Sequence, residues 1–254
     1  MRSRWLIVVT LGVALATQTF ATTVMIVVTD KNIVYVAADS LQSYTETKET
    51  LHHCKIRRLG SSYWAAASEF YESNATGFNL EKFVDSLGTE GTIHSKMDRF
   101  IGAIDKPMKR ELGLMALHDR DLYARLLKSS RPPLEIAFVE SKDGVTEVDV
   151  VRFFVASLSN DWRAERTRVS TADQIFGVTG TGSYTVAGAY LEKHIPELNE
   201  DPSKVLRESM QNAANVDPEG SGPPFSIIRL DATGAQWLVG GACKCETDLV
   251  RKTF

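Results

Sequence analysis

The 254-residue sequence has few cysteines, little excess charge and no linker-like stretch in its middle. Three cysteines are too few to define a disulfide framework. The net charge is only −3 and no long basic block occurs, which disfavours nucleic acids and anionic membranes as partners. Because no Pro/Gly/Ser-rich segment divides the chain, and 43% of its residues are hydrophobic, one globular domain with a sizeable core is expected.

The N-terminus departs from this ordinary composition. A basic tetrapeptide precedes an apolar run from Trp5 to Ala16, and small residues follow it. This pattern is typical of a secretory signal peptide, and the run is short for a membrane span. Two cleavage positions fit. A cut after Ala16 leaves Thr17 first, and a cut after Ala21 leaves Thr22 first.

The expected organisation is therefore a signal peptide over residues 1–21, or 1–16 with the earlier cut, followed by one domain over residues 22–254. Such a protein is exported, either periplasmic or secreted, and has no membrane contact after cleavage. The cysteines fit export in two ways. Cys54 pairs with Cys243 or Cys245, or the cysteines remain free thiols.

Strand patterns dominate the start and the end of the domain. Two β-rich runs flank the polar triplet Asp30-Lys31-Asn32, which predicts a hairpin. Two further strands are expected up to residue 67, several between 134 and 170 with an edge strand last, and two after residue 224.

Helical patterns fall into two blocks. In the first, apolar stripes predict two helices between residues 70 and 107, with Pro107 breaking the second, and an additional helical insertion is expected from Met108 to Leu127. In the second, helices are expected from Ser183 to His194 and from Pro202 to Asn215. Because helices come in consecutive pairs and do not alternate with strands, a doubly wound parallel sheet is disfavoured. The expected fold class is α+β, a four-layer αββα sandwich of two antiparallel sheets with a helix pair on each outer surface.

Four short stretches carry a pattern beyond secondary structure. They are Thr22-Thr23-Val24, Val36-Ala37-Ala38-Asp39-Ser40, Lys55-Ile56-Arg57-Arg58-Leu59 and Gly180-Thr181-Gly182-Ser183-Tyr184. They resemble segments of the N-terminal-nucleophile (Ntn) hydrolases of the proteasome β-subunit and bacterial HslV type. The 16-residue separation of Asp39 and Lys55 equals that family's spacing.

The resemblance implies a catalytic role for each matched position. Thr22 would be the nucleophile, with its own α-amine as general base. Asp39 and Lys55 would form the charged pair that positions it. A cationic lysine beside the threonine favours loss of the hydroxyl proton and keeps the amine neutral near pH 7.

The family also uses a serine in its glycine turn, and an aspartate and a serine after its fourth helix. By resemblance these positions are Thr181, Asp217 and Ser221. An oxyanion-binding backbone N–H is expected at the turn after the fourth strand, near Ala67-Ser68.

Some positions depart from the family pattern. Counted from Thr22, Asp39 lies one residue further along than in the family, whereas counted from Thr23 the spacing matches. An extra residue in the hairpin turn explains this equally well, so Thr22 is preferred and Thr23 is the second choice. Alanines from Ala65 to Ala67 replace the glycines that usually precede the oxyanion turn.

The expected function is that of an exported threonine-type hydrolase that cleaves peptide or other amide bonds through an acyl-enzyme, without a cofactor. Its expected partner is a peptide or amide substrate, and the resemblance adds a possible homo-oligomeric ring. The His52-His53-Cys54 triplet does not indicate zinc, because adjacent strand residues point apart and no second ligand cluster is visible. Two alternatives remain: a non-catalytic subunit of the same fold, or an exported binding protein.

Overall fold

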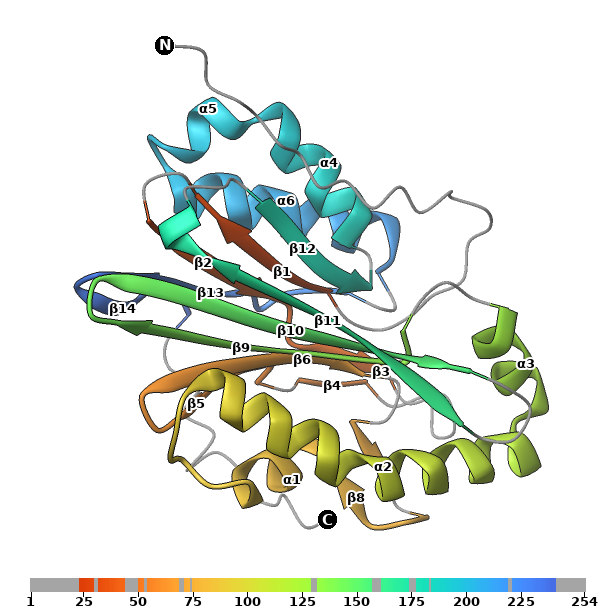
Figure 1. Cartoon of the computed structure of the whole chain (residues 1–254). Helices are drawn as coiled ribbons and strands as arrows, with labels where there is room; N and C mark the ends of the chain where they lie inside the picture. Colours follow the sequence, from red (N-terminus) through yellow and green to blue (C-terminus); the bar gives the residue numbers. More distant parts are fainter. Residues whose placement is uncertain are drawn as a thin grey trace, which may run out of the picture.

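Two five-stranded antiparallel sheets form the centre of a mixed α+β fold (Figure 1). The computed structural model describes residues 23–29, 32–43, 50–52, 54–68, 71–73, 75–128, 132–156, 161–173, 177–182, 184–218 and 221–240. The predicted signal peptide and the centre of the first turn, Asp30-Lys31, lie outside these residues.

The first sheet has the strand order β12-β1-β2-β13-β14. Its strands are β1 (Thr23–Val28), β2 (Val34–Ala38), β12 (Gly177–Gly182), β13 (Ser226–Asp231) and β14 (Gly234–Val239). The predicted hairpin is confirmed, because β1 and β2 pair antiparallel with Val27 opposite Tyr35. Asn32 ends the turn with a φ of 60°, a left-handed conformation that asparagine adopts more readily than most residues.

The second sheet has the strand order β11-β10-β9-β6-β5. Its strands are β5 (Ile56–Leu59), β6 (Ser62–Ser68), β9 (Leu134–Lys142), β10 (Val145–Val155) and β11 (Trp162–Ser170). The last of these is an edge strand, as the polar composition of that segment predicts. Two small two-stranded sheets are formed by β3 (Leu41–Ser43) with β4 (Thr50–His52), and by β7 (Glu72–Ser73) with β8 (Phe78–Asn79).

The helices of the described residues fall into two sets, separated in sequence by β9 to β12. They are α1 (Leu80–Ser86), α2 (Ile93–His118) and α3 (Arg120–Lys128), then α4 (Tyr184–Lys193), α5 (Ile195–Leu198) and α6 (Pro202–Val216). A short 3-10 helix spans Thr171–Asp173. Within the part of the chain that the structure describes, no helix is long and apolar enough to cross a membrane.

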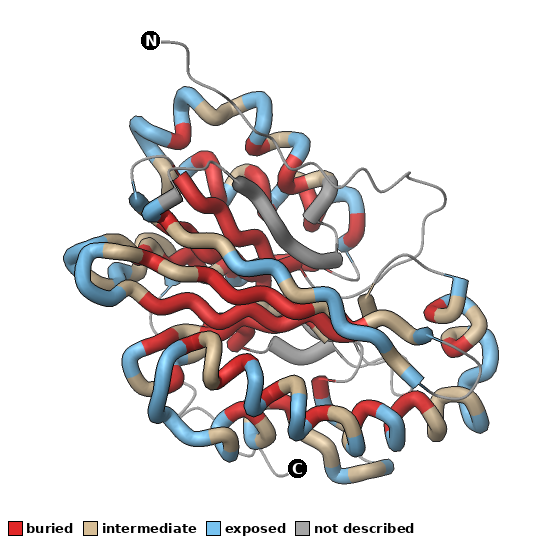
Figure 2. The backbone as a smooth tube through the Cα atoms, in the orientation of Figure 1, coloured by how far each residue is buried: buried red, intermediate tan, exposed pale blue. Residues whose placement is uncertain are grey.

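Three hydrophobic clusters hold these elements together. The first joins α1, α2 and α3 to the second sheet, and the third joins α4, α5 and α6 to the first sheet. The second cluster draws side chains from both sheets, among them Val24, Ala38 and Ala67, so the sheets face each other across it. Buried positions accordingly concentrate along the central strands, while the helices expose their outer faces (Figure 2).

Two details of the helices differ from expectation. The second set holds three helices where a pair was predicted. In the first set the second helix does not end at Pro107, so the additional helical segment predicted over Met108–Leu127 is shared between α2 and α3. Instead α2 runs for 26 residues through the proline. Its buried stripe, which includes Phe100 and Ile104 before the proline and Met108 after it, packs on the second sheet and outweighs the lost backbone hydrogen bond. The last residue of α2 is His118. The next residue, Asp119, accepts the Leu122 N–H through its carboxylate at 3.0 Å and so caps the start of α3.

Replacing Pro107 with alanine should stabilise the protein. The substitution restores a backbone N–H inside α2 and removes the helix penalty of proline, which is worth up to about 3 kcal/mol. Chemical denaturation should show a higher free energy of unfolding for Pro107→Ala, while the neighbouring exposed change Lys106→Ala should have little effect. A less stable Pro107→Ala protein would mean that packing of the ring contributes more than the missing hydrogen bond.

Candidate active site

The backbone of Thr23, the first residue of β1, forms two hydrogen bonds with Asp39. Its N–H donates to Oδ1 of Asp39 at 3.0 Å, and its carbonyl accepts the Asp39 N–H at 3.1 Å. Asp39 directly follows β2, so the β1–β2 pairing brings the two residues together. Thr23 is completely buried.

Alternation along β1 decides which way the Thr23 side chain points. Val24 and Ile26 belong to the cluster between the sheets, whereas Met25 and Val27 belong to the cluster under the helices. Successive strand residues face opposite sides, so Thr23 faces the helical side. There its Oγ1 lies 3.0 Å from Oγ of Ser221, in the loop after α6.

Asp39 also forms a buried ion pair with Lys55. The Lys55 Nζ lies 2.5 Å from Asp39 Oδ1, and neither side chain is exposed. Burial lowers the pKa of Lys55, because the charged amine loses its hydration, and the attraction of Asp39 opposes this effect. Thr23 N and Lys55 Nζ therefore meet at one carboxylate oxygen.

The loop after α6 closes the site. Asp217 caps the C-terminus of α6, and its carbonyl accepts the Ser221 N–H at 2.8 Å. The next residue, Gly222, donates its N–H to the second carboxylate oxygen of Asp39, Oδ2, at 3.1 Å. In this turn the Ser221 hydroxyl points towards Thr23, and the Gly222 N–H is a second backbone donor to the buried carboxylate of Asp39.

The structure therefore brings four residues named from the sequence into one constellation: Thr23, Asp39, Lys55 and Ser221. Asp217 joins it through the backbone of the same loop. Thr22, the preferred nucleophile from the sequence, lies outside the described residues.

Two other predicted positions sit in strands instead of turns. Thr181 lies within β12 and pairs with Val24, the residue after Thr23; the structure describes its backbone but not its side chain. Ala67 and Ser68 are the last residues of β6, opposite Glu135 and Leu134, so any turn with an oxyanion donor begins after them. The alanine run likewise packs as strand.

Two residues near the site were missed by the sequence reasoning. Gly222 contacts Asp39 through its backbone, and only the Gly220-Ser221-Gly222 spacing hinted at a tight turn there. Glu135 was read as an ordinary strand residue. Its charge within an apolar run was the available signal, since a carboxylate is rarely buried without a partner.

Glu135 lies at the same end of the second sheet as Lys55, which directly precedes Ile56, the partner of Ala65 on β6. It stands opposite Ala67 and two residues before Ala137, and both alanines belong to the cluster between the sheets. Its partner is Arg152 on β10, whose Nε lies 3.1 Å from Oε2. Burial raises the pKa of Glu135 to about 8, because the loss of hydration outweighs the attraction of Arg152.

Cys54, next to Lys55, is disulfide-bonded, and its partner lies outside the described residues. Of the alternatives left open by the sequence, the paired cysteine is therefore the one observed. Among the described residues, no group of three or more His, Cys, Asp and Glu side chains is placed to hold a metal ion.

Chemically, the constellation holds a hydroxyl and a main-chain nitrogen of one residue beside a buried cation. A buried ammonium favours developing negative charge on a neighbouring oxygen, and a second hydroxyl can relay a proton. In comparisons with known proteins, the sequence matches no family model, and no curated protein is significantly similar to it.

The buried ion pair should contribute strongly to stability. Lys55→Met leaves the Asp39 charge buried with fewer partners, which should cost about 3–5 kcal/mol in the free energy of unfolding. The double variant Asp39→Asn/Lys55→Met should recover much of this loss, because it buries no charge. Breaking the exposed Lys109–Asp105 pair with Lys109→Met should change little. Equal stability of Lys55→Met and wild type would show that the pair is not buried in solution.

Glu135 should make stability depend on pH. In the unfolded chain this side chain loses its proton above its ordinary pKa of 4.5, whereas in the folded protein it keeps the proton up to about pH 8. The free energy of unfolding therefore falls as pH rises from 4.5 to 8. Relative to wild type, Glu135→Gln should become more stable with rising pH across that window, by up to about 1.4 kcal/mol per pH unit. Denaturation series at several pH values measure this, with the exposed Glu90→Gln as the matched control. A difference independent of pH would contradict the shift.

Proposed function

We propose that the protein is an exported N-terminal-threonine hydrolase that cleaves peptide or other amide bonds through an acyl-enzyme. We assign its fold to the four-layer αββα sandwich of the Ntn hydrolases of the proteasome type. Two facing sheets with helices on their outer surfaces support this assignment. The resemblance of the Asp39 and Lys55 segments to that family supports it further.

One observation carries the proposal, namely that Thr23 is hydrogen-bonded to Asp39 and Ser221 while Lys55 binds the same oxygen of Asp39. We assign the nucleophile to Thr23 in place of Thr22, the first choice from the sequence. Both the hydroxyl and the main-chain nitrogen of Thr23 have partners in the constellation, and its separation from Asp39 matches the family spacing.

In the proposed reaction, Oγ1 of Thr23 attacks the carbonyl carbon of the scissile amide. The free α-amine of Thr23 takes the hydroxyl proton and later gives it to the leaving amine, which departs as the acyl ester forms. Water, deprotonated by the same amine, then attacks the ester carbonyl; the bond to Oγ1 breaks, the acyl part leaves as a carboxylic acid, and the amine returns the proton to Oγ1. The positive charge of Lys55 favours the ionised oxygen and keeps the neighbouring amine unprotonated, while Asp39 orients both.

This mechanism requires that the bond between Thr22 and Thr23 be cut. The lone pair of an acylated nitrogen is delocalised into the carbonyl group and cannot act as a base, so a chain that still carries residues before Thr23 is inactive. Cleavage after Ala21 must therefore be followed by removal of Thr22.

The N-terminal mass of the exported protein and the activity of matched threonine variants test the proposal. We expect a chain that begins at Thr23, hydrolyses peptide arylamides and is labelled by a threonine-directed electrophile. Thr23→Ala should lower the rate of hydrolysis by about three orders of magnitude or more and abolish labelling, whereas Thr23→Ser should keep part of the activity.

Thr22→Ala is the matched control, because it changes the adjacent threonine and should leave the mature enzyme identical. An active chain that begins at Thr22 and needs that residue would move the nucleophile to Thr22. A chain that begins at Thr17 without further trimming would overturn the proposal.

A further inference from the structure

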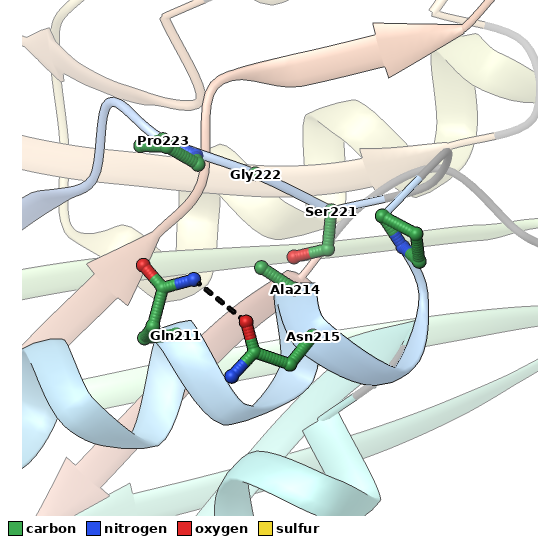
Figure 3. Close-up of a pocket in the computed structure, with 7 residues that line it drawn as sticks. Gln211, Ala214, Asn215, Ser221, Gly222 and Pro223 are labelled. Atoms are coloured by element: carbon green, nitrogen blue, oxygen red, sulfur yellow. Dashed lines mark hydrogen bonds between the residues drawn. The ribbon is translucent and has the colours of Figure 1, made fainter.

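A surface cavity of about 420 Å³ adjoins the candidate site (Figure 3). One wall is the last part of α6, with Gln211 and Asn215, and the other is formed by Pro218 and by the segment from Ser221 to Pro223. Ser221 belongs to both features. It lines the cavity, and its hydroxyl lies 3.0 Å from Oγ1 of Thr23. The cavity is thus separated from the proposed nucleophile by a single side chain.

The walls of the cavity suit an uncharged polar ligand. None of the described residues that line it is charged. Gln211 and Asn215 are both exposed, and the Gln211 Nε2 donates to Oδ1 of Asn215 at 3.0 Å. Carboxamides offer both donors and acceptors, which is the pairing that a peptide main chain needs. Prolines 218 and 223 add an apolar surface beside them.

The direction of proton transfer decides which part of a substrate reaches this cavity. The group that protonates the leaving amine is the nitrogen of Thr23, which donates to one carboxylate oxygen of Asp39, while Gly222 of the Ser221–Gly222 turn donates to the other. The leaving amine must approach that nitrogen to receive the proton. Ser221 of this turn contacts Oγ1 of Thr23 and lines the cavity, so a leaving segment that passes the turn enters the cavity.

We propose that this cavity binds the peptide segment on the leaving-group side of the scissile bond, and that Asn215 and Gln211 hydrogen-bond to its main chain. The inference rests on the proposed function, because it assigns a substrate segment to the same nucleophile. It predicts that the enzyme cleaves within peptides better than it releases a small aromatic amine.

The experiment compares two substrates that share one acyl part. An acetylated tetrapeptide, chosen from a peptide library as the best arylamide substrate, is joined either to 4-nitroaniline or to a three-residue peptide. The ratio of kcat/KM for the extended substrate to that for the arylamide isolates the leaving-group side, because the acyl part cancels. Asn215→Ala and Gln211→Ala should each lower this ratio by about five- to tenfold through the loss of a neutral hydrogen bond.

Asn212→Ala is the matched control on the same helix. Its side chain donates to the Glu208 carbonyl and does not line the cavity, so the ratio should stay at the wild-type value. The rate of labelling by a threonine-directed electrophile, which has no leaving peptide, shows whether a variant has kept its site intact.

An unchanged ratio in Asn215→Ala and Gln211→Ala, with both substrates still cleaved, would overturn this inference and leave the proposed function in place. An equal loss on both substrates would also overturn it, because the effect would then not concern the leaving group. Absence of cleavage and of labelling in the wild-type protein would overturn the proposed function and this inference together.

Discussion

The buried contact between Asp39 and Lys55 is the interaction on which the arrangement of the site depends. Asp39 follows a strand of the first sheet, and Lys55 precedes an edge strand of the second, so their ion pair joins the two sheets. A carboxylate away from water needs several donors. Asp39 finds them in Lys55 and in the backbone N–H groups of Thr23 and Gly222. One charge thus orders three segments of chain that are far apart in sequence.

The two faces of β1 explain how such a polar group can sit in a core. Val24, Ile26 and Val28 point into the space between the sheets, and the alternate residues Met25 and Val27 pack under the helices. Both faces are apolar along the strand, and polarity appears only at Thr23, where the strand begins. The site therefore occupies an end of the sheets, and the hydrophobic clusters behind it remain uninterrupted.

The part of this structure that sequence reasoning could predict is the part with local patterns. Two β-rich runs around a polar triplet located the hairpin at Asn32, and an apolar stripe located the helix that begins at Pro202. The resemblance of the Asp39 and Lys55 segments to the proteasome-type family predicted that these two residues act together. The contact of Thr23 with Ser221 joins residues 198 positions apart and leaves no local trace. The role of Glu135 depends on strand register, and the continuity of α2 through Pro107 depends on packing against the second sheet. In both cases tertiary contacts override the local preference.

If the protein acts as proposed, the hydrogen bond from Thr23 N to Asp39 has a consequence for activation by proteolysis. A peptide nitrogen and a primary amine can both donate this bond, so the carboxylate keeps its partner whether or not the chain continues before Thr23. In the proposed mechanism, proteolysis would change the basicity of that nitrogen without requiring any strand or loop to move. The precursor would then be a preassembled enzyme that lacks only a free base, and the timing of its activity would be set by the protease step alone.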